Sequence, residues 1–172
     1  MAKKALIIID MLNDFVLKGA PLKVPKIETI TGPIQREIEK AKLKNFPVIY
    51  LCDSHRPDDP EFKRFAPHAV KNTEGAKVIG QLKPQGSDII VKKTTFSGFY
   101  KTELERVLNM MGVNHLRVTG CVTNICVYLV VFEAISRGYE VDVVSDAVIG
   151  LNQRDHRFAL RQMKDVLKAN VI

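Results

Sequence analysis

The sequence predicts an α/β fold with three layers, in which a mostly parallel sheet is covered by helices on both faces. Short runs rich in β-branched residues alternate along the chain with longer stretches of helical periodicity, as in repeated strand–helix–strand units. The short runs are apolar almost throughout, which is typical of parallel strands buried on both faces. Composition is even along the 172 residues, so we expect one domain spanning 1–172. The five strands are predicted over 5–9, 48–52, 88–91, 116–119 and 141–145.

Four helices are predicted over 33–44, 102–111, 123–137 and 153–168. The first follows a start signal that ends in Pro33. The second begins with a capping box of Thr102 and Glu105 and ends at Gly112. The third is apolar nearly all round, so we expect more than one of its faces to be buried. In the fourth, the stripe predicted to face the core consists of Phe158, Met163, Val166 and Leu167.

Composition and charge exclude several functional classes. The net charge is +7, but the lysines are spread along the chain, so we expect no nucleic-acid partner. The longest apolar run covers 125–132, far short of the ~18 residues that cross a bilayer, and the N-terminus lacks a signal-peptide cleavage site. We therefore expect no membrane partner. Three cysteines without Cys-x-x-Cys spacing argue against a disulfide framework and favour a cytoplasmic location.

Two connections are much longer than the few residues typical of α/β folds. They cover about 11–28 and 53–80, and each follows a predicted strand. Because α/β proteins place their sites at the carboxyl ends of parallel strands, the polar residues at these ends are candidates for chemistry.

Three such candidates follow the first, third and fourth strands. Asp10 is a carboxylate at the end of a buried strand, where it is costly unless paired; alternatively, it caps a turn. Cys126 begins the third helix, where backbone N–H groups stabilise a thiolate; alternatively, it is a small buried hydrophobe, as we expect for Cys52 and Cys121. Lys93 follows the third strand directly after another lysine, so one of the two points inward; alternatively, it is a solvated strand end.

The second strand ends in a candidate metal site. Asp53 and His55 have strand spacing, which places both side chains on one face, and His68 follows thirteen residues after His55. One carboxylate and two imidazoles suit zinc, iron or manganese with open positions. Glu61 is a possible fourth ligand. Alternatively, the two histidines are loop residues that face a substrate carboxylate.

Taken together, these motifs resemble the isochorismatase-like cysteine hydrolases, the superfamily that includes nicotinamidases. The resemblance covers nearly the whole chain and implies a Rossmann-like fold. It is carried by Asp10 with Asn13-Asp14-Phe15, by Asp53-Ser54-His55, by Phe65-Ala66-Pro67-His68, by Lys93 with Phe96-Ser97-Gly98-Phe99, and by Gly120 to Val127.

The resemblance also implies roles for individual residues. Cys126, Asp10 and Lys93 would form a catalytic triad, and the backbone N–H groups of Val122 and Cys126 would form an oxyanion hole. A cis peptide would join Cys121 to Val122. Phe15, Phe65 and Phe96 would line a pocket for the substrate ring. One divalent ion, zinc before iron or manganese, would hold the ring nitrogen of the substrate, with no organic cofactor.

The activity implied first is hydrolysis of nicotinamide to nicotinate and ammonia through a thioester on Cys126. The alternative is a cysteine hydrolase of another small amide or ureido compound, similar to carbamoylsarcosine or ureidoacrylate amidases, or an isochorismatase-related hydrolase. A third possibility is a catalytically idle relative that serves as a binding module. The family also implies a homo-oligomer, either a dimer or a tetramer.

Overall fold

The computed structural model describes residues 3–172 and contains a six-stranded, fully parallel sheet with strand order β3-β2-β1-β4-β5-β6. The strands are β1 Lys4–Ile9, β2 Val48–Asp53, β3 Ile89–Lys93, β4 His115–Cys121, β5 Glu140–Ile149 and β6 Asn170–Val171. All five predicted strands are present. The short β6 extends the sheet at its edge, and β5 continues well beyond the predicted 141–145.

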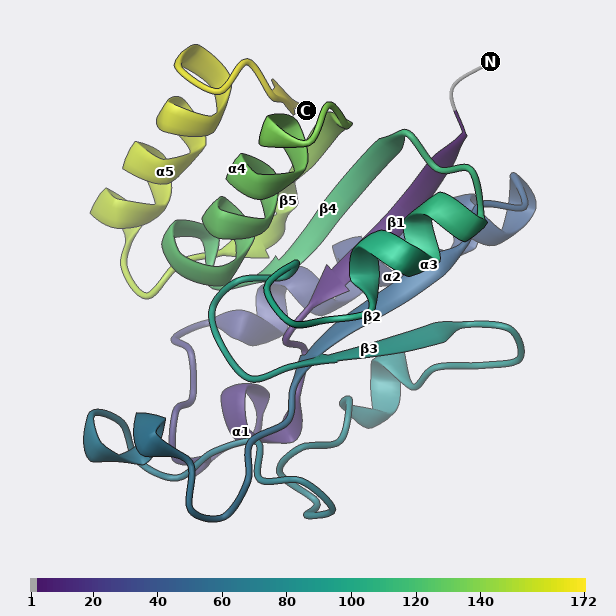
Figure 1. Ribbon diagram of the computed structural model, residues 1–172. Helices are drawn as coiled ribbons and strands as arrows, with labels where there is room; N and C mark the ends of the chain where they lie inside the picture. The colour runs from purple at the N-terminus through teal and green to yellow at the C-terminus, as the bar shows by residue number, and fades with distance from the viewer. Residues whose placement is uncertain (1–2) are drawn as a thin grey trace.

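Helices cover both faces of the sheet, which confirms the predicted three-layer α/β fold. Figure 1 shows α3, α4 and α5 in front of the sheet and α2 behind it. The α-helices are α1 Asn13–Val16, α2 Thr31–Leu43, α3 Leu104–Met110, α4 Tyr128–Ser136 and α5 Gln153–Asp165. Short 3₁₀ helices cover Ile27–Ile30, Pro60–Lys63 and Gly80–Leu82, and a π-helical turn covers Thr123–Val127.

The hydrophobic core consists of two clusters, one on each face of the sheet. In β1, Ile7 and Ile9 face the α3–α5 side, whereas Leu6 and Ile8 face the α2 side. Because alternate residues of a strand point to opposite faces, a strand covered on both sides must be apolar at successive positions. This explains the uninterrupted apolar runs in the sequence.

The first turn of α3 differs from the prediction. The Thr102 hydroxyl donates to the Gly98 carbonyl at 2.7 Å, and the Leu104 N–H donates to Thr102 Oγ1 at 3.3 Å. Thr102 therefore closes a turn with Gly98, and the helix begins only at Leu104, with Glu103 as its N-cap. The predicted capping box of Thr102 and Glu105 is wrong because the hydroxyl has a partner earlier in the chain.

The predicted core stripe of α5 is only partly correct. Met163 is buried and Leu167 packs against the core, but Phe158 and Val166 are 53% and 61% exposed. Val166 lies just beyond the end of the helix, and Phe158 lies beneath the Arg161 guanidinium, 5.6 Å from its ring centre. The neighbouring Ala159 faces the core in its place.

The third predicted helix also divides into two parts. The π-helical turn Thr123–Val127 precedes α4, of which Val130, Val131 and Ala134 are buried. Within residues 3–172, no helix is long and apolar enough to cross a membrane.

A charged cluster fixes the amino ends of β1, β4 and β5. Asp142, on β5, is buried and lies 3.1 Å from Lys4 Nζ, 3.0 Å from His115 Nε2 and 3.4 Å from an Arg117 nitrogen. The Asn170 side chain donates to the same carboxylate at 3.0 Å, which ties β6 to β5. Burial alone raises the pKa of Asp142, but hydrogen bonds from Asn170, Lys4 and His115 outweigh it and lower that pKa.

Asp142→Asn should therefore lower the free energy of unfolding at neutral pH by about 1.5–3 kcal/mol, the usual range for hydrogen bonds to a charged group. Because folding lowers this pKa, the contribution is complete above the unfolded value of about 3.9 and disappears as the pH falls through the folded value. Urea denaturation near pH 7 and near pH 3 measures the gap between wild type and variant. A gap that stays constant between these pH values would contradict the assignment.

Candidate active site

Four chemically active side chains lie together at the carboxyl ends of the strands. Asp10 follows β1, Asp53 ends β2, Lys93 ends β3, and Cys126 lies in the turn after β4. Asp53 and Lys93 are also paired in register between β2 and β3. All four are buried. The parallel sheet thus brings together groups that are far apart in the sequence.

Lys93 is the centre of this group. Its Nζ lies 2.5 Å from Asp53 Oδ1, 2.7 Å from Asp10 Oδ2 and 3.7 Å from Cys126 Sγ. The Asp53 N–H donates to Asp10 Oδ1 at 2.9 Å. Lys93 is 1% exposed, so of the two adjacent lysines it is the one that points inward, and it is not a solvated strand end.

A close approach of β4 to β1 places Asp10 beside the fourth strand. Gly120 has a φ of +106°, and a Cβ built there would lie 2.1 Å from the Ile9 carbonyl oxygen. Only glycine fits this position. Next to it, Cys121 Sγ lies 3.3 Å from the Asp10 carbonyl oxygen. Asp10 itself has a positive φ of 52°. The backbone therefore departs from the extended strand conformation directly after β1, at the residue that enters the site.

Burial and charge give the two carboxyl groups different acidities. Burial and the neighbouring Asp53 charge raise the pKa of Asp10 to about 6, against the effect of Lys93. For Asp53, burial is outweighed by Lys93 and His55, so its pKa is lowered. Burial raises the pKa of the Cys126 thiol although Lys93 opposes this. Carboxyl groups whose pKa values are pushed apart have distinct acid–base roles in many sites.

The turn that carries Cys126 is a π-helical turn rather than the predicted first turn of an α-helix. The peptide bond between Cys121 and Val122 is cis. The Val122 carbonyl then accepts a hydrogen bond from the Val127 N–H at 3.2 Å, which closes the turn around Cys126. Both Val122 and Cys126 face the cavity described next.

A cavity of about 140 Å³ opens onto Cys126. The three aromatic residues singled out in the sequence, Phe15, Phe65 and Phe96, all line it. Phe65 and Phe96 form an edge-to-face pair with ring centres 6.1 Å apart. Its other lining residues are Asp10, Leu22, Val24, Asp53, Glu61, His68, Cys121, Val122, Ile125 and Leu151. The walls are mainly apolar, with acidic groups at a few points.

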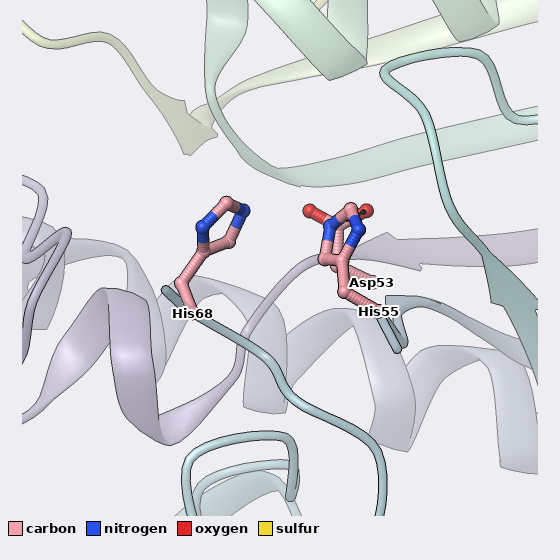
Figure 2. A group of neighbouring side chains, drawn as sticks. All are labelled: Asp53, His55 and His68. Carbon is pink, nitrogen blue, oxygen red and sulfur yellow. Dashed lines mark ion pairs between the residues drawn. The ribbon is translucent and has the colours of Figure 1, made fainter. Parts of the chain in front are cut away.

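Asp53, His55 and His68 form a cluster with one ligand atom from each within 4.8 Å of the others. Figure 2 shows the three side chains extending in the same direction from two segments of the chain. His55 Nδ1 lies 3.1 Å from Asp59 Oδ2, and His68 Nδ1 lies 2.8 Å from the Ala66 carbonyl oxygen. With Nδ1 as the donor in each ring, both Nε2 atoms carry free lone pairs.

This donor set fits a divalent metal ion. His55 Nε2 is buried and has no hydrogen-bond partner within residues 3–172, which is costly unless another ligand satisfies it. Burial lowers the pKa of this ring, but the neighbouring carboxylates of Asp53 and Asp59 outweigh burial and raise the pKa to about 9. Metal binding would therefore displace a proton from His55.

The structure adds information on three residues near the cavity, and a ligand role for Glu61 stays a prediction. Glu61 lines the cavity, but its carboxylate groups with His55 and Asp59 rather than with Asp53 and His68. Asp59, which orients His55, was not among the candidates from the sequence. The local signal that could have pointed to it is its position four residues after His55 and directly before a proline. Cys121 was expected in the core, and it is buried but also lines the cavity.

Comparisons with known proteins agree with the fold. The isochorismatase domain matches residues 4–172. The pyrazinamidase/nicotinamidase of Streptococcus mutans is 32% identical with a TM-score of 0.93, covering 98% of this chain and 99% of that one. A pyrazinamidase of Pyrococcus horikoshii, solved in complex with zinc, is 29% identical with a TM-score of 0.93, covering 99% and 98%.

An N-carbamoylsarcosine amidase from Thermoplasma acidophilum is also similar, with 32% identity and a TM-score of 0.88 over 98% of this chain and 95% of that one. These neighbours have different substrates but share one architecture. Since the domain match covers nearly the entire chain, the chain belongs to the isochorismatase family of hydrolases.

Proposed function

We propose that this protein is a metal-containing cysteine amidase that hydrolyses nicotinamide to nicotinate and ammonia. The observation that carries the proposal is the shared cavity: Cys126 and Asp10, which is paired with Lys93, line the same aromatic-walled space as Asp53 and His68 of the metal-ligand cluster. The catalytic residues are Cys126, Asp10 and Lys93.

The first half of the reaction forms a thioester. Burial keeps the Cys126 thiol protonated, so it needs a base, and Asp10, with a pKa of about 6, takes the proton. Lys93 stabilises the thiolate. The sulfur attacks the carboxamide carbon, and the backbone N–H groups of Val122 and Cys126 bind the oxyanion. The C–N bond then breaks, and Asp10 returns its proton to the departing nitrogen, which leaves as ammonia.

The second half releases the acid. Water enters where ammonia left, gives a proton to Asp10 and attacks the thioester carbon. The C–S bond breaks, the Cys126 sulfur recovers the proton from Asp10, and the acid departs and loses its own proton to solvent to become nicotinate. Asp53 remains an anion throughout because Lys93 and His55 lower its pKa, and it holds Lys93 in place.

Asp53, His55 and His68 would hold the metal ion. Glu61 lies close to His55. When bound, the ion supplies a Lewis-acidic position for the ring nitrogen of the substrate. Zinc is the first candidate because imidazole and carboxylate ligands suit it. Phe15, Phe65 and Phe96 bind the faces and edges of the ring. The carboxamide is thereby oriented toward Cys126.

The charge of the cavity favours a neutral aromatic amide over the alternative substrates. Ureidoacrylate, N-carbamoylsarcosine and isochorismate all carry carboxylates, which need a cationic partner in an apolar site. Among residues 3–172, the cavity lining includes no arginine and no lysine, whereas Asp10, Asp53 and Glu61 contribute acidic groups. An anionic substrate would therefore depend on the metal ion or on the two histidines for a cationic partner, whereas a neutral amide needs none.

Cys126→Ala should abolish ammonia release from nicotinamide while the protein stays folded, because the thiol is small and its role is covalent. Cys52→Ala is the matched control. It removes a buried thiol that packs in the cluster on the α2 side of the sheet, and it should retain turnover. Coupled ammonia assays and circular dichroism measure both. Residual turnover above a few per cent in Cys126→Ala would exclude this nucleophile.

Asp10→Asn should lower kcat by about 10²–10⁴-fold, the usual contribution of a positioned base. Asparagine keeps an oxygen that can accept the Asp53 N–H, so the shape of the strand end is retained and the loss reflects the missing carboxylate charge, which serves as the base and pairs with Lys93. KM and metal content should change little. Steady-state kinetics measure kcat and KM separately, and elemental analysis measures the metal content. A kcat within tenfold of wild type would argue for another base.

Removal of the metal by a chelator should raise KM for nicotinamide strongly, and His68→Ala should do the same. The rate at which iodoacetamide modifies Cys126, followed by peptide mapping, should change much less because this reagent has no ring nitrogen. His115→Ala, at the opposite end of the sheet, is the matched control and should retain metal. A protein without bound metal and with activity indifferent to chelation would favour the ureido-type hydrolase instead.

A further inference from the structure

Asp14 has no role in the mechanism above, yet its carboxylate lies where two distant segments meet. Oδ2 accepts a hydrogen bond from the Ala69 N–H at 2.8 Å, across 55 positions of sequence. Its own backbone N–H donates to the Gly75 carbonyl at 3.0 Å. Beside it, the Asn13 side chain donates to the Glu74 carbonyl at 2.7 Å. The segment that begins α1 is thus tied to the loop that carries His68.

The Ala69 peptide connects the two histidines of the metal cluster. Ala69 directly follows His68, is fully buried and has a positive φ of 43°, a conformation that a residue with a Cβ adopts only when its surroundings impose it. Its carbonyl accepts the His55 N–H at 3.0 Å, and the His55 carbonyl accepts the Lys71 N–H at 2.8 Å. Ala69 is therefore held by Asp14 through its N–H and by His55 through its carbonyl.

Gly75 leaves the space that the Asp14 carboxylate occupies. A Cβ built on Gly75 would lie 2.0 Å from Oδ2, 2.3 Å from Cγ and 2.4 Å from Oδ1 of Asp14. The φ of Gly75 is not in the left-handed region, so conformational freedom does not explain this glycine. Contact with Asp14 does, because any larger residue would displace the carboxylate.

We propose that Asp14 is a positioning residue for the metal site, with Gly75 as its seat. Its hydrogen bond to the Ala69 N–H fixes the backbone on which His68 is carried relative to His55. This inference rests on the proposed metal-binding role of Asp53, His55 and His68. The required feature is a hydrogen-bond acceptor rather than a charge, because within residues 3–172 Asp14 forms no ion pair.

The test is titration of the full-length, metal-free protein with Co²⁺, followed by visible absorption, and with Zn²⁺ in competition with a chelator. Asp14→Ala should weaken the affinity for both ions at least tenfold, and Asp14→Asn, which keeps an acceptor, should restore it to within about threefold of wild type. Gly75→Ala should weaken binding as Asp14→Ala does. Gly80→Ala is the matched control, since a Cβ there meets nothing within 4 Å, and it should bind as wild type does.

Two further readouts separate this positioning role from general damage. Hydrogen exchange of the Ala69 amide should accelerate in folded Asp14→Ala, and alkylation of Cys126 should keep its wild-type rate. Should Asp14→Ala fail to fold, the comparison of Gly75→Ala with Gly80→Ala decides the question. Wild-type affinity in both Asp14→Ala and Gly75→Ala overturns the positioning role alone. Failure of the wild-type protein to bind either ion overturns the proposed metal site, and the positioning role with it.

Discussion

The buried ammonium of Lys93 is the interaction on which the site depends. Removing such a cation from water costs several kcal/mol unless it is paired and hydrogen-bonded. Here Asp10 and Asp53 lie 2.7 Å and 2.5 Å from Nζ, so three neighbouring strand ends are joined by one charge. Loss of either carboxylate would leave Lys93 undercompensated. The strand order, with β1 and β2 adjacent and β3 at the edge, is what allows the three groups to meet.

Asp53 links this charge centre to the metal cluster. One of its oxygens pairs with Lys93, and the same residue belongs to the group with His55 and His68. The two halves of the site therefore share an anion. This sharing explains why Asp10, and not Asp53, has the raised pKa and is the residue proposed as the base. An anion already engaged by a buried ammonium and a histidine has little affinity for a further proton.

The sequence predicted the fold well because continuous apolar runs distinguish buried parallel strands from helices, whose apolar residues recur with helical periodicity. It predicted the strand-end residues Asp10, Lys93 and Cys126 as candidates for a similar reason, since parallel strands bring their carboxyl ends to one edge. The misplaced elements have local causes. The Thr102 hydroxyl donates to the Gly98 carbonyl, and the Phe158 ring packs under the Arg161 guanidinium. Helical periodicity predicts neither contact.

Loop residues that hold other residues in place could not be predicted in this way. Asp59 orients His55, and Asp14 binds the Ala69 N–H of a loop that lies far along the chain. Periodicity and strand ends give no information on such contacts, because the relative position of the two partners is set by the folded loops. The same holds for Gly75, whose missing side chain has meaning only beside Asp14.

The division between strand ends and loops also accounts for the range of substrates among the structural neighbours. Asp10, Lys93 and Cys126 are attached to the rigid sheet or its first turn, whereas Phe15, Phe65 and His68 come from the two long connections. Chemistry placed on the sheet is hard to move, because moving it would disturb the core. Groups on loops can change without that cost. A nicotinamidase and an N-carbamoylsarcosine amidase can therefore share one scaffold, and in the proposed reaction the loop residues of this chain would select the amide that reaches Cys126.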